Sequence, residues 1–62
     1  MIKFIKVKKI LSENRFNVHY INVFHIVDFC AWNECTEILL SNNQTIEVTD
    51  TVQEILEKIN NI

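Results

Sequence analysis

Glycine and proline are both absent from this sequence of 62 residues. The phosphate-binding loops of the Walker and Rossmann types need glycine at fixed positions, so both are excluded. Turns must instead be built from asparagine, aspartate, serine or glutamate, whose polar side chains bond to nearby backbone. Asparagine also tolerates positive φ, and asparagines between apolar runs therefore mark where the chain is expected to reverse.

Cysteine is scarce, and long apolar runs are missing. The two cysteines are too few for the disulfide framework of a small secreted domain. The longest apolar stretches, such as residues 29–32, are far shorter than a membrane span. Residues 1–6 alternate charged and apolar side chains and lack the apolar core of a signal peptide. We therefore expect a cytoplasmic protein with no membrane contact.

Hydrophobic residues, in contrast, are plentiful at 48% of the chain. A chain of this length forms one domain, here residues 1–62, and buries only about 60% of the surface of its unfolded state. Domains this small usually gain further stability from disulfides, a metal ion or oligomerisation. With so much apolar surface to cover, self-association is the expected solution.

Charge is distributed unevenly along the chain. Residues 1–15 hold five basic side chains and one acidic one, whereas residues 16–62 hold one basic and seven acidic ones. The basic segment could pair with the acidic remainder or steer a charged partner, but a solvated face is the simplest interpretation. An alternative is nucleic-acid binding, with the segment's lysines contacting phosphates and nearby aromatic rings stacking on bases. The lysines of this alternative are Lys3, Lys6, Lys8 and Lys9.

Alternating apolar and polar side chains predict a series of short strands. The expected strands are residues 2–11, 15–21, 26–32, 36–41 and 45–48. Adjacent apolar residues at Ile10 and Leu11 break the alternation, which indicates either a bulge or two partly covered faces. Asn42 and Asn43 give the clearest hairpin signal, because asparagine can adopt the left-handed conformation of a primed turn.

The period then changes to that of an amphipathic helix, with apolar residues at i, i+3, i+4 and i+7. These residues are Val52, Ile55, Leu56 and Ile59. Asp50 with Gln53, or Thr51 with Glu54, would start the helix with a capping box. Glu54 and Lys58 are spaced to form an i, i+4 ion pair. The predicted fold class is α+β, a small antiparallel meander of four to five strands followed by one C-terminal helix.

A helix of about 10 residues covers only part of one sheet face. Alternation places several large apolar side chains on the face away from it, where together they would form an interface patch. The residues of this predicted interface are Trp32, Ile26, Ile21, Leu39 and Phe4. We expect a symmetric dimer centred on Trp32, so that Trp32→Ala weakens assembly more than it unfolds the subunit.

Cys30, Cys35, His19 and His25 are the candidate soft-metal ligands. The cysteines flank a predicted turn and could face each other across a hairpin, but a zinc knuckle would favour glycine there. A cysteine nucleophile would need a histidine base nearby, and the spacing does not favour one. Buried packing is the expected role of both cysteines, and we predict no metal, no cofactor, no catalytic residue and no enzymatic activity.

The order of several segments resembles a known family. Residues 20–22 read Tyr-Ile-Asn, residues 36–48 form a strand and an asparagine-containing hairpin, and residues 52–59 form the final helix. This order resembles that of the FlbD/SwrD-type proteins, small bacterial proteins associated with flagellar and swarming motility. The family commonly has proline after the Tyr-Ile-Asn segment and glycine in the hairpin, where this chain has Val23 and Asn43. The resemblance implies the same fold and a non-enzymatic regulatory role exerted through protein contacts.

The sequence therefore predicts a non-catalytic, homo-oligomeric, regulatory module that binds a protein partner. A small inhibitor of a host protein, encoded by a phage or a mobile element, is one alternative. A nucleic-acid-binding transcriptional regulator is another.

Overall fold

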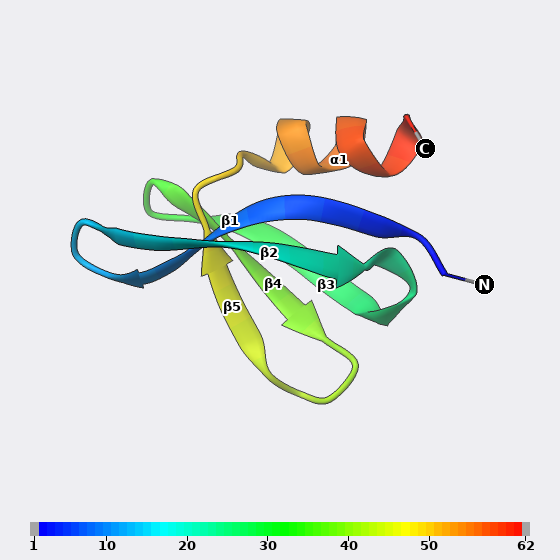
Figure 1. Cartoon of the computed structure of the whole chain (residues 1–62), viewed down its shortest axis with the longest axis horizontal. Coiled ribbons are helices and arrows are strands. Elements are labelled where there is room, and N and C mark those ends of the chain that lie inside the picture. Colours follow the sequence, from blue (N-terminus) through cyan, green and yellow to red (C-terminus); the bar gives the residue numbers. More distant parts are fainter. Residues whose placement is uncertain (1, 62) are drawn as a thin grey trace.

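The computed structural model describes residues 2–61 and contains one five-stranded antiparallel sheet followed by one helix (Figure 1). The elements in chain order are β1 (Phe4–Ser12), β2 (Arg15–Asn22), the 3-10 helix η1 (Val23–His25), β3 (Ile26–Trp32), β4 (Cys35–Leu40), β5 (Thr45–Val48) and α1 (Val52–Asn60). The predicted α+β class is confirmed, as is the order of a sheet and then a C-terminal helix.

The strand order across the sheet is β2-β1-β5-β4-β3, which differs from the predicted meander. β1 and β2 form one hairpin, and β3, β4 and β5 form a three-stranded unit. The two units meet where Lys9 of β1 pairs with Val48 of β5. η1 carries the chain from β2 at one edge of the sheet to β3 at the other, so these consecutive strands are not neighbours.

Asparagine residues form the turns of a chain that has no glycine. Asn14, Asn33 and Asn43 each lie in a hairpin turn and have φ of 65°, 53° and 69°. Asparagine is the residue other than glycine that most readily takes this left-handed conformation. In the β4–β5 turn, the Asn42 side chain also accepts a hydrogen bond of 3.1 Å from the Gln44 backbone N–H.

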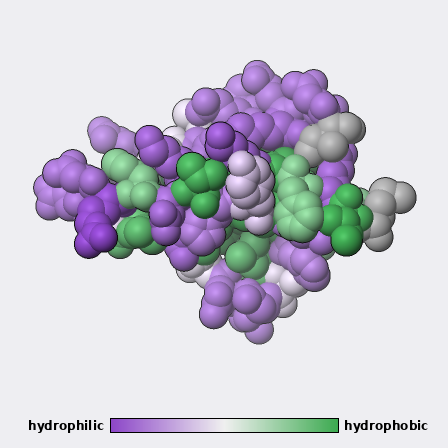
Figure 2. Space-filling model, viewed as in Figure 1, coloured by the Kyte–Doolittle hydropathy of each residue, from purple (hydrophilic) through white to green (hydrophobic). Residues whose placement is uncertain are grey.

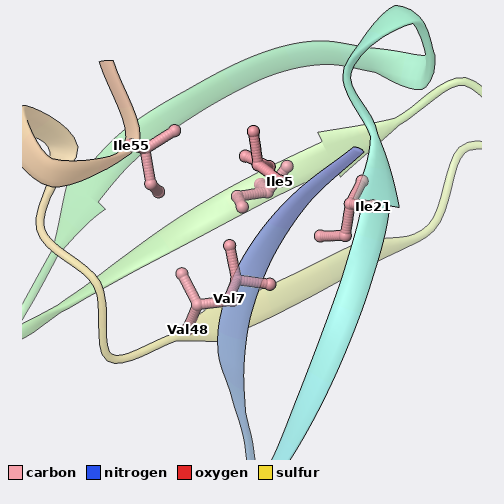
Figure 3. Close-up of a cluster of buried hydrophobic side chains, with 6 residues drawn as sticks. Ile5, Val7, Ile21, Val48 and Ile55 are labelled. Carbon is pink, nitrogen blue, oxygen red and sulfur yellow. The ribbon is translucent and has the colours of Figure 1, made fainter. Parts of the chain in front are cut away.

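The core lies between the curled sheet and the helix (Figure 3). Its buried members are Ile5, Val7, Ile21, Ile38, Val48 and Ile55. α1 packs against both β1 and β3, which are separated by two strands in the sheet order, so the sheet must curl to bring them to one helix. Ile55 points from the helix toward the strand cluster and is fully buried.

The helix starts at the second of the two predicted capping boxes. Thr51 accepts a hydrogen bond from the Glu54 backbone N–H at 3.1 Å, and Glu54 accepts one from the Thr51 N–H at 2.8 Å. Glu54 is therefore engaged at the helix N-terminus. Lys58 forms its ion pair with Asp50 at 2.5 Å rather than the expected pair with Glu54.

Candidate functional site

Three large apolar side chains of β2 point away from the core. We call Phe16, Val18 and Tyr20 the β2 outer row; their exposed fractions are 44%, 51% and 65%. They share one side of the strand because side chains alternate. In the antiparallel register with β1, Val18 lies opposite Lys8 and Tyr20 opposite Lys6. The result is an apolar row on one strand beside a basic row on the next.

The basic row contacts the apolar one directly. The Lys8 ammonium lies 5.0 Å from the centroid of the Phe16 ring, within cation–π range. Phe4 is also exposed at the start of β1. Figure 2 shows hydrophobic groups in a broken row across the face that carries β1 and β2, with hydrophilic groups between them. This face therefore offers apolar contact area and positive charge together.

β2 is also an edge strand. Within residues 2–61 it pairs with β1 alone, so the backbone groups on its other side are open to a further strand. Natural edges are usually protected by bulges, charges or proline. β3, at the opposite edge, has a bulge between Ile26 and Asp28, and Asp28 adds a charge. Residues 16–22 of β2 contain no lysine, arginine, acidic residue or proline, so β2 is the less protected edge.

Two of the five predicted interface residues lie on the wrong face for that role. Ile21 is a core residue with 8% of its surface exposed, and Ile26 packs against the same core. Phe4 and Trp32 are exposed as expected, and Leu39 is half-buried on the outer side of β4. Phe4 and Trp32 do not form one patch, because β5 and β4 separate their strands in the sheet.

Bulges explain both errors. In β1–β2, Ile10 pairs with Phe16 but Ser12 pairs with Arg15, so Leu11 is an extra residue. A regular hairpin with the Ser12–Arg15 pairing would place Ile21 opposite Lys6, on the outer face. The extra residue shifts the register by one, and a shift of one moves every side chain of the strand to the other face.

A second bulge lies at the start of β3. Ile26 pairs with Leu40 and Asp28 pairs with Leu39, so Val27 is the extra residue. Ile26 therefore turns inward, whereas simple alternation would place it outward with Asp28. The available signal for these bulges was the pair of adjacent apolar residues at Ile10–Leu11 and at Ile26–Val27, which interrupts a period of two.

The four lysines of the nucleic-acid alternative do not share a face. Lys6 and Lys8 are exposed on the outer side of β1. Lys9 lies opposite the buried Val48 and so belongs to the inner side, and Lys3 precedes β1. The outer face thus presents two of the four predicted lysines.

The cysteines lie on the outer side of the β3–β4 hairpin and are not buried as predicted. Cys30 is exposed, and Cys35 is half-buried. The Cys35 Sγ lies 3.1 Å from the Trp32 carbonyl oxygen and 3.3 Å from Glu47 Oε2. Desolvation raises the pKa of the Cys35 thiol, and the hydrogen bond and charge of Glu47 and the charge of Glu37 raise it further. This environment disfavours the thiolate that a nucleophile or a metal ligand requires.

No group of three or more histidine, cysteine or acidic side chains within residues 2–61 is arranged to hold a metal ion. Within the same residues, α1 is too short to cross a membrane.

The most connected polar side chain has a structural role. Asp50 accepts hydrogen bonds from Lys58 at 2.5 Å and from the Lys8 backbone N–H at 2.9 Å. Lys58 also donates to the Lys6 carbonyl oxygen at 2.6 Å. The Lys8 N–H and the Lys6 carbonyl oxygen of β1 thus have hydrogen-bond partners, although β1 is paired with β5 at one residue pair. Asp50 and Lys58 thereby attach the helix to β1.

Comparison of the chain with models of protein families, with curated proteins and with solved structures found no match in any of the three.

Proposed function

We propose that this protein is a non-catalytic binding module of the cytoplasm that forms a homodimer through β2. The observation that carries the proposal is the exposure of Phe16, Val18 and Tyr20 on an edge strand whose backbone is open to further pairing. A second copy related by a two-fold axis would pair β2 with its own β2 in antiparallel fashion. The two outer rows would then meet at the centre of one continuous sheet.

The gain in apolar burial is large enough to matter. Tyr20 is 65% exposed, which for an aromatic side chain of roughly 200 Å² leaves about 130 Å² open to water, and edge pairing would cover the flank that faces the partner strand. At about 25 cal/mol per Å², burial of this whole area would contribute about 3 kcal/mol, and the covered flank contributes a part of that. Phe16 and Val18 add to it in each protomer. Because association has a substantial entropic cost, a dimer of moderate affinity is the expected result.

Charge does not oppose this arrangement. The lysines of the outer face lie on β1, and the order of strands across the dimer would be β1, β2, β2 and β1. The two β1 strands would therefore lie about 14 Å apart, three times the spacing of neighbouring strands. This exceeds the Debye length of about 8 Å at physiological ionic strength, so Lys8 of one copy is largely screened from Lys8 of the other.

Analytical ultracentrifugation of Val18→Glu tests the proposal. Within one subunit the new carboxylate lies opposite Lys8, which supports folding because opposite charges across a strand pair are favourable. Across the two-fold axis, two carboxylates would meet near the centre of the interface. We expect wild type to dimerise at tens of micromolar and Val18→Glu to be monomeric. Wild type that stays monomeric throughout this range contradicts the proposal.

Val27→Glu is the matched control, because Val27 is similarly exposed but lies on the edge strand β3. It should dimerise like wild type. Trp32→Ala distinguishes a dimer formed through β2 from a dimer formed through the interface that the sequence predicts around Trp32. Loss of the dimer in Trp32→Ala, with its retention in Val18→Glu, would favour the Trp32 interface instead.

The dimer would present its remaining surface to a protein partner. A regulatory role of this kind is what the resemblance to the FlbD/SwrD-type proteins implies, and an inhibitor encoded by a phage or a mobile element would act in the same manner. Pull-down with wild type and with Val18→Glu, each followed by identification of the bound protein, would show whether a partner requires the dimer.

Single-stranded nucleic acid is the second candidate, favoured by one observation. Lys6 and Lys8 lie beside Tyr20 and Phe16, so positive charge and aromatic rings share a sheet face. Such faces bind single strands by stacking and phosphate contacts. Fluorescence anisotropy with a labelled oligothymidine at low salt tests this candidate, with the double variant Lys6→Gln/Lys8→Gln as the comparison. Absence of binding by wild type removes it.

A further inference from the structure

A groove opens on the inner side of the sheet, at the end that the helix leaves uncovered. Its volume is about 550 Å³, within the usual range for sites that bind small molecules. It lies between β2, η1 and the β4–β5 hairpin, and no residue of α1 lines it. Of the β2 outer row, Tyr20 reaches the rim of this groove, whereas Phe16 and Val18 lie away from it.

The inner side of the sheet is divided into an apolar half and a polar half. Along β1, the inward residues are Ile5 and Val7, both buried, and then Lys9. Along β2, buried Ile21 is followed on the same side by His19, which lies opposite Val7. The helix packs on the apolar half, and the groove lies where the apolar half meets the polar half.

The lining combines an apolar floor with a basic and polar rim. Ile21, Leu40 and Ile46 form the floor and belong to or pack against the core. The rim carries side chains that can donate hydrogen bonds, and no acidic residue lines the groove. The rim includes Lys9, His19, His25, Ser41, Asn42 and Gln44.

Lys9 has no evident structural task. β1 is a central strand, so an inward lysine is not needed to protect an edge. Within residues 2–61 the ion pair that forms is between Lys58 and Asp50, and the Lys9 ammonium has no carboxylate partner there. A cation held at the border of an apolar surface, without an anion beside it, is suited to receive one from a ligand.

His25 also lines the groove, and a contact with Ser41 holds its ring in place. Its Nδ1 lies 2.8 Å from the Ser41 Oγ. When the serine hydroxyl donates to Nδ1, the Nε2–H of the neutral ring is left as a donor. In that tautomer, His25 adds a hydrogen-bond donor to the groove that Lys9 also lines.

We propose that this groove binds a small organic anion that has a ring-sized apolar body and one oxyanion group, such as a carboxylate or a phosphate. The apolar body rests on Ile21, Leu40 and Ile46. The oxyanion group lies toward Lys9 and His19 and accepts hydrogen bonds from the rim.

NMR titration with benzenesulfonate tests this proposal, because the probe has an aromatic body and keeps one negative charge over the usual pH range. Benzenesulfonamide, nearly the same shape but neutral, is the matched probe. We expect saturable shifts of the Ile21, Leu40 and Ile46 methyl signals with benzenesulfonate, with a dissociation constant on the order of 1 mM for so small a ligand. The sulfonamide should bind about tenfold or more weakly.

Lys9→Gln should weaken benzenesulfonate binding about tenfold and leave the sulfonamide unaffected. Lys6→Gln removes the same charge from the outer face and should change neither. If Lys9→Gln does not fold, His19→Gln replaces it, and the comparison of the two probes on wild type needs no variant. Equal binding of the two probes, shifts confined to Phe16 and Val18, or no saturable shift would each overturn the proposal.

Discussion

Asp50 is the residue whose replacement should reveal most about how this small fold is held together. Its carboxylate joins the helix to the sheet through Lys58, and it accepts the Lys8 backbone N–H on β1. Its own carbonyl oxygen accepts a hydrogen bond of 2.6 Å from the buried Thr36 hydroxyl. We compare Asp50→Asn, which keeps an acceptor for the Lys8 N–H but removes the charge, with Asp50→Ala, which removes both.

The expected cost follows from the number and type of bonds lost. Hydrogen bonds to charged groups contribute about 1.5–3 kcal/mol each, and neutral ones about 1 kcal/mol. The ion pair is partly screened, because the Lys58 side chain is 37% exposed. We therefore expect Asp50→Asn to cost about 1 kcal/mol and Asp50→Ala about 2–3 kcal/mol. A domain of this size has a total free energy of unfolding of only about 3–9 kcal/mol, so the alanine variant should melt about 10–20 °C lower.

The pH dependence gives a second, independent measurement. Burial raises the pKa of the Asp50 carboxyl, but the hydrogen bond and charge of Lys58 and the Lys8 N–H lower it by more, so the folded-state pKa lies below its ordinary value. The group therefore stabilises the fold above about pH 4, and this stabilisation is lost as the pH falls through the folded-state pKa. The difference in the free energy of unfolding between wild type and Asp50→Asn should be largest at pH 7 and should shrink toward pH 2.

Thermal and urea unfolding in the Val18→Glu background, which we expect to be monomeric, would measure these free energies without a contribution from association. Glu13→Gln neutralises an exposed carboxylate at a hairpin tip and should change stability by less than about 0.5 kcal/mol. If Asp50→Ala matches Glu13→Gln, or if its cost is unchanged at pH 2, the reasoning about Asp50 is wrong.

Further predictions concern the helix and the cysteines. Thr51→Ala removes the helix N-cap and should cost about 1 kcal/mol in urea unfolding, whereas Thr51→Ser should cost little. Ile55→Val leaves a small cavity in the core and should cost about 0.5–1.5 kcal/mol, and Ile55→Ala about 2–5 kcal/mol, enough to unfold much of the protein. Cys30 should react with a thiol reagent at pH 8 faster than Cys35, because Cys30 is exposed whereas the raised pKa of Cys35 lowers its thiolate fraction. Equal rates in the single variants Cys30→Ser and Cys35→Ser would contradict this order.

Local signals in the sequence were sufficient to predict the strands and α1, but not the short helix η1. The spacing of Val52, Ile55, Leu56 and Ile59 predicted the helix, because a period near 3.6 belongs to no other regular structure. Alternation predicted β3 and β5 with their observed bounds, and the Asn42–Asn43 turn was expected because a chain without glycine needs asparagine at positive φ. Each of these features depends on residues only a few positions apart.

The candidate site depended on register, which local pattern does not determine. The sequence placed Phe16, Val18 and Tyr20 together on one side of a strand and Ile21 on the other, but not which side faces the core. One extra residue, Leu11, decides this through the pairing of β1 with β2.

By itself, the sequence determined the α+β class, the five strands, the capped helix and the asparagine turns, because short-range hydrogen bonding and side-chain period specify them. Tertiary structure alone decided the strand order, the pairing of β1 with β5 and the outward direction of the β2 outer row. The physical reason is that a side chain in a strand can point to only two faces of the sheet. A bulge of one extra residue exchanges these two faces for the rest of the strand. Which direction is inward is then set by the core that distant strands and the helix build together.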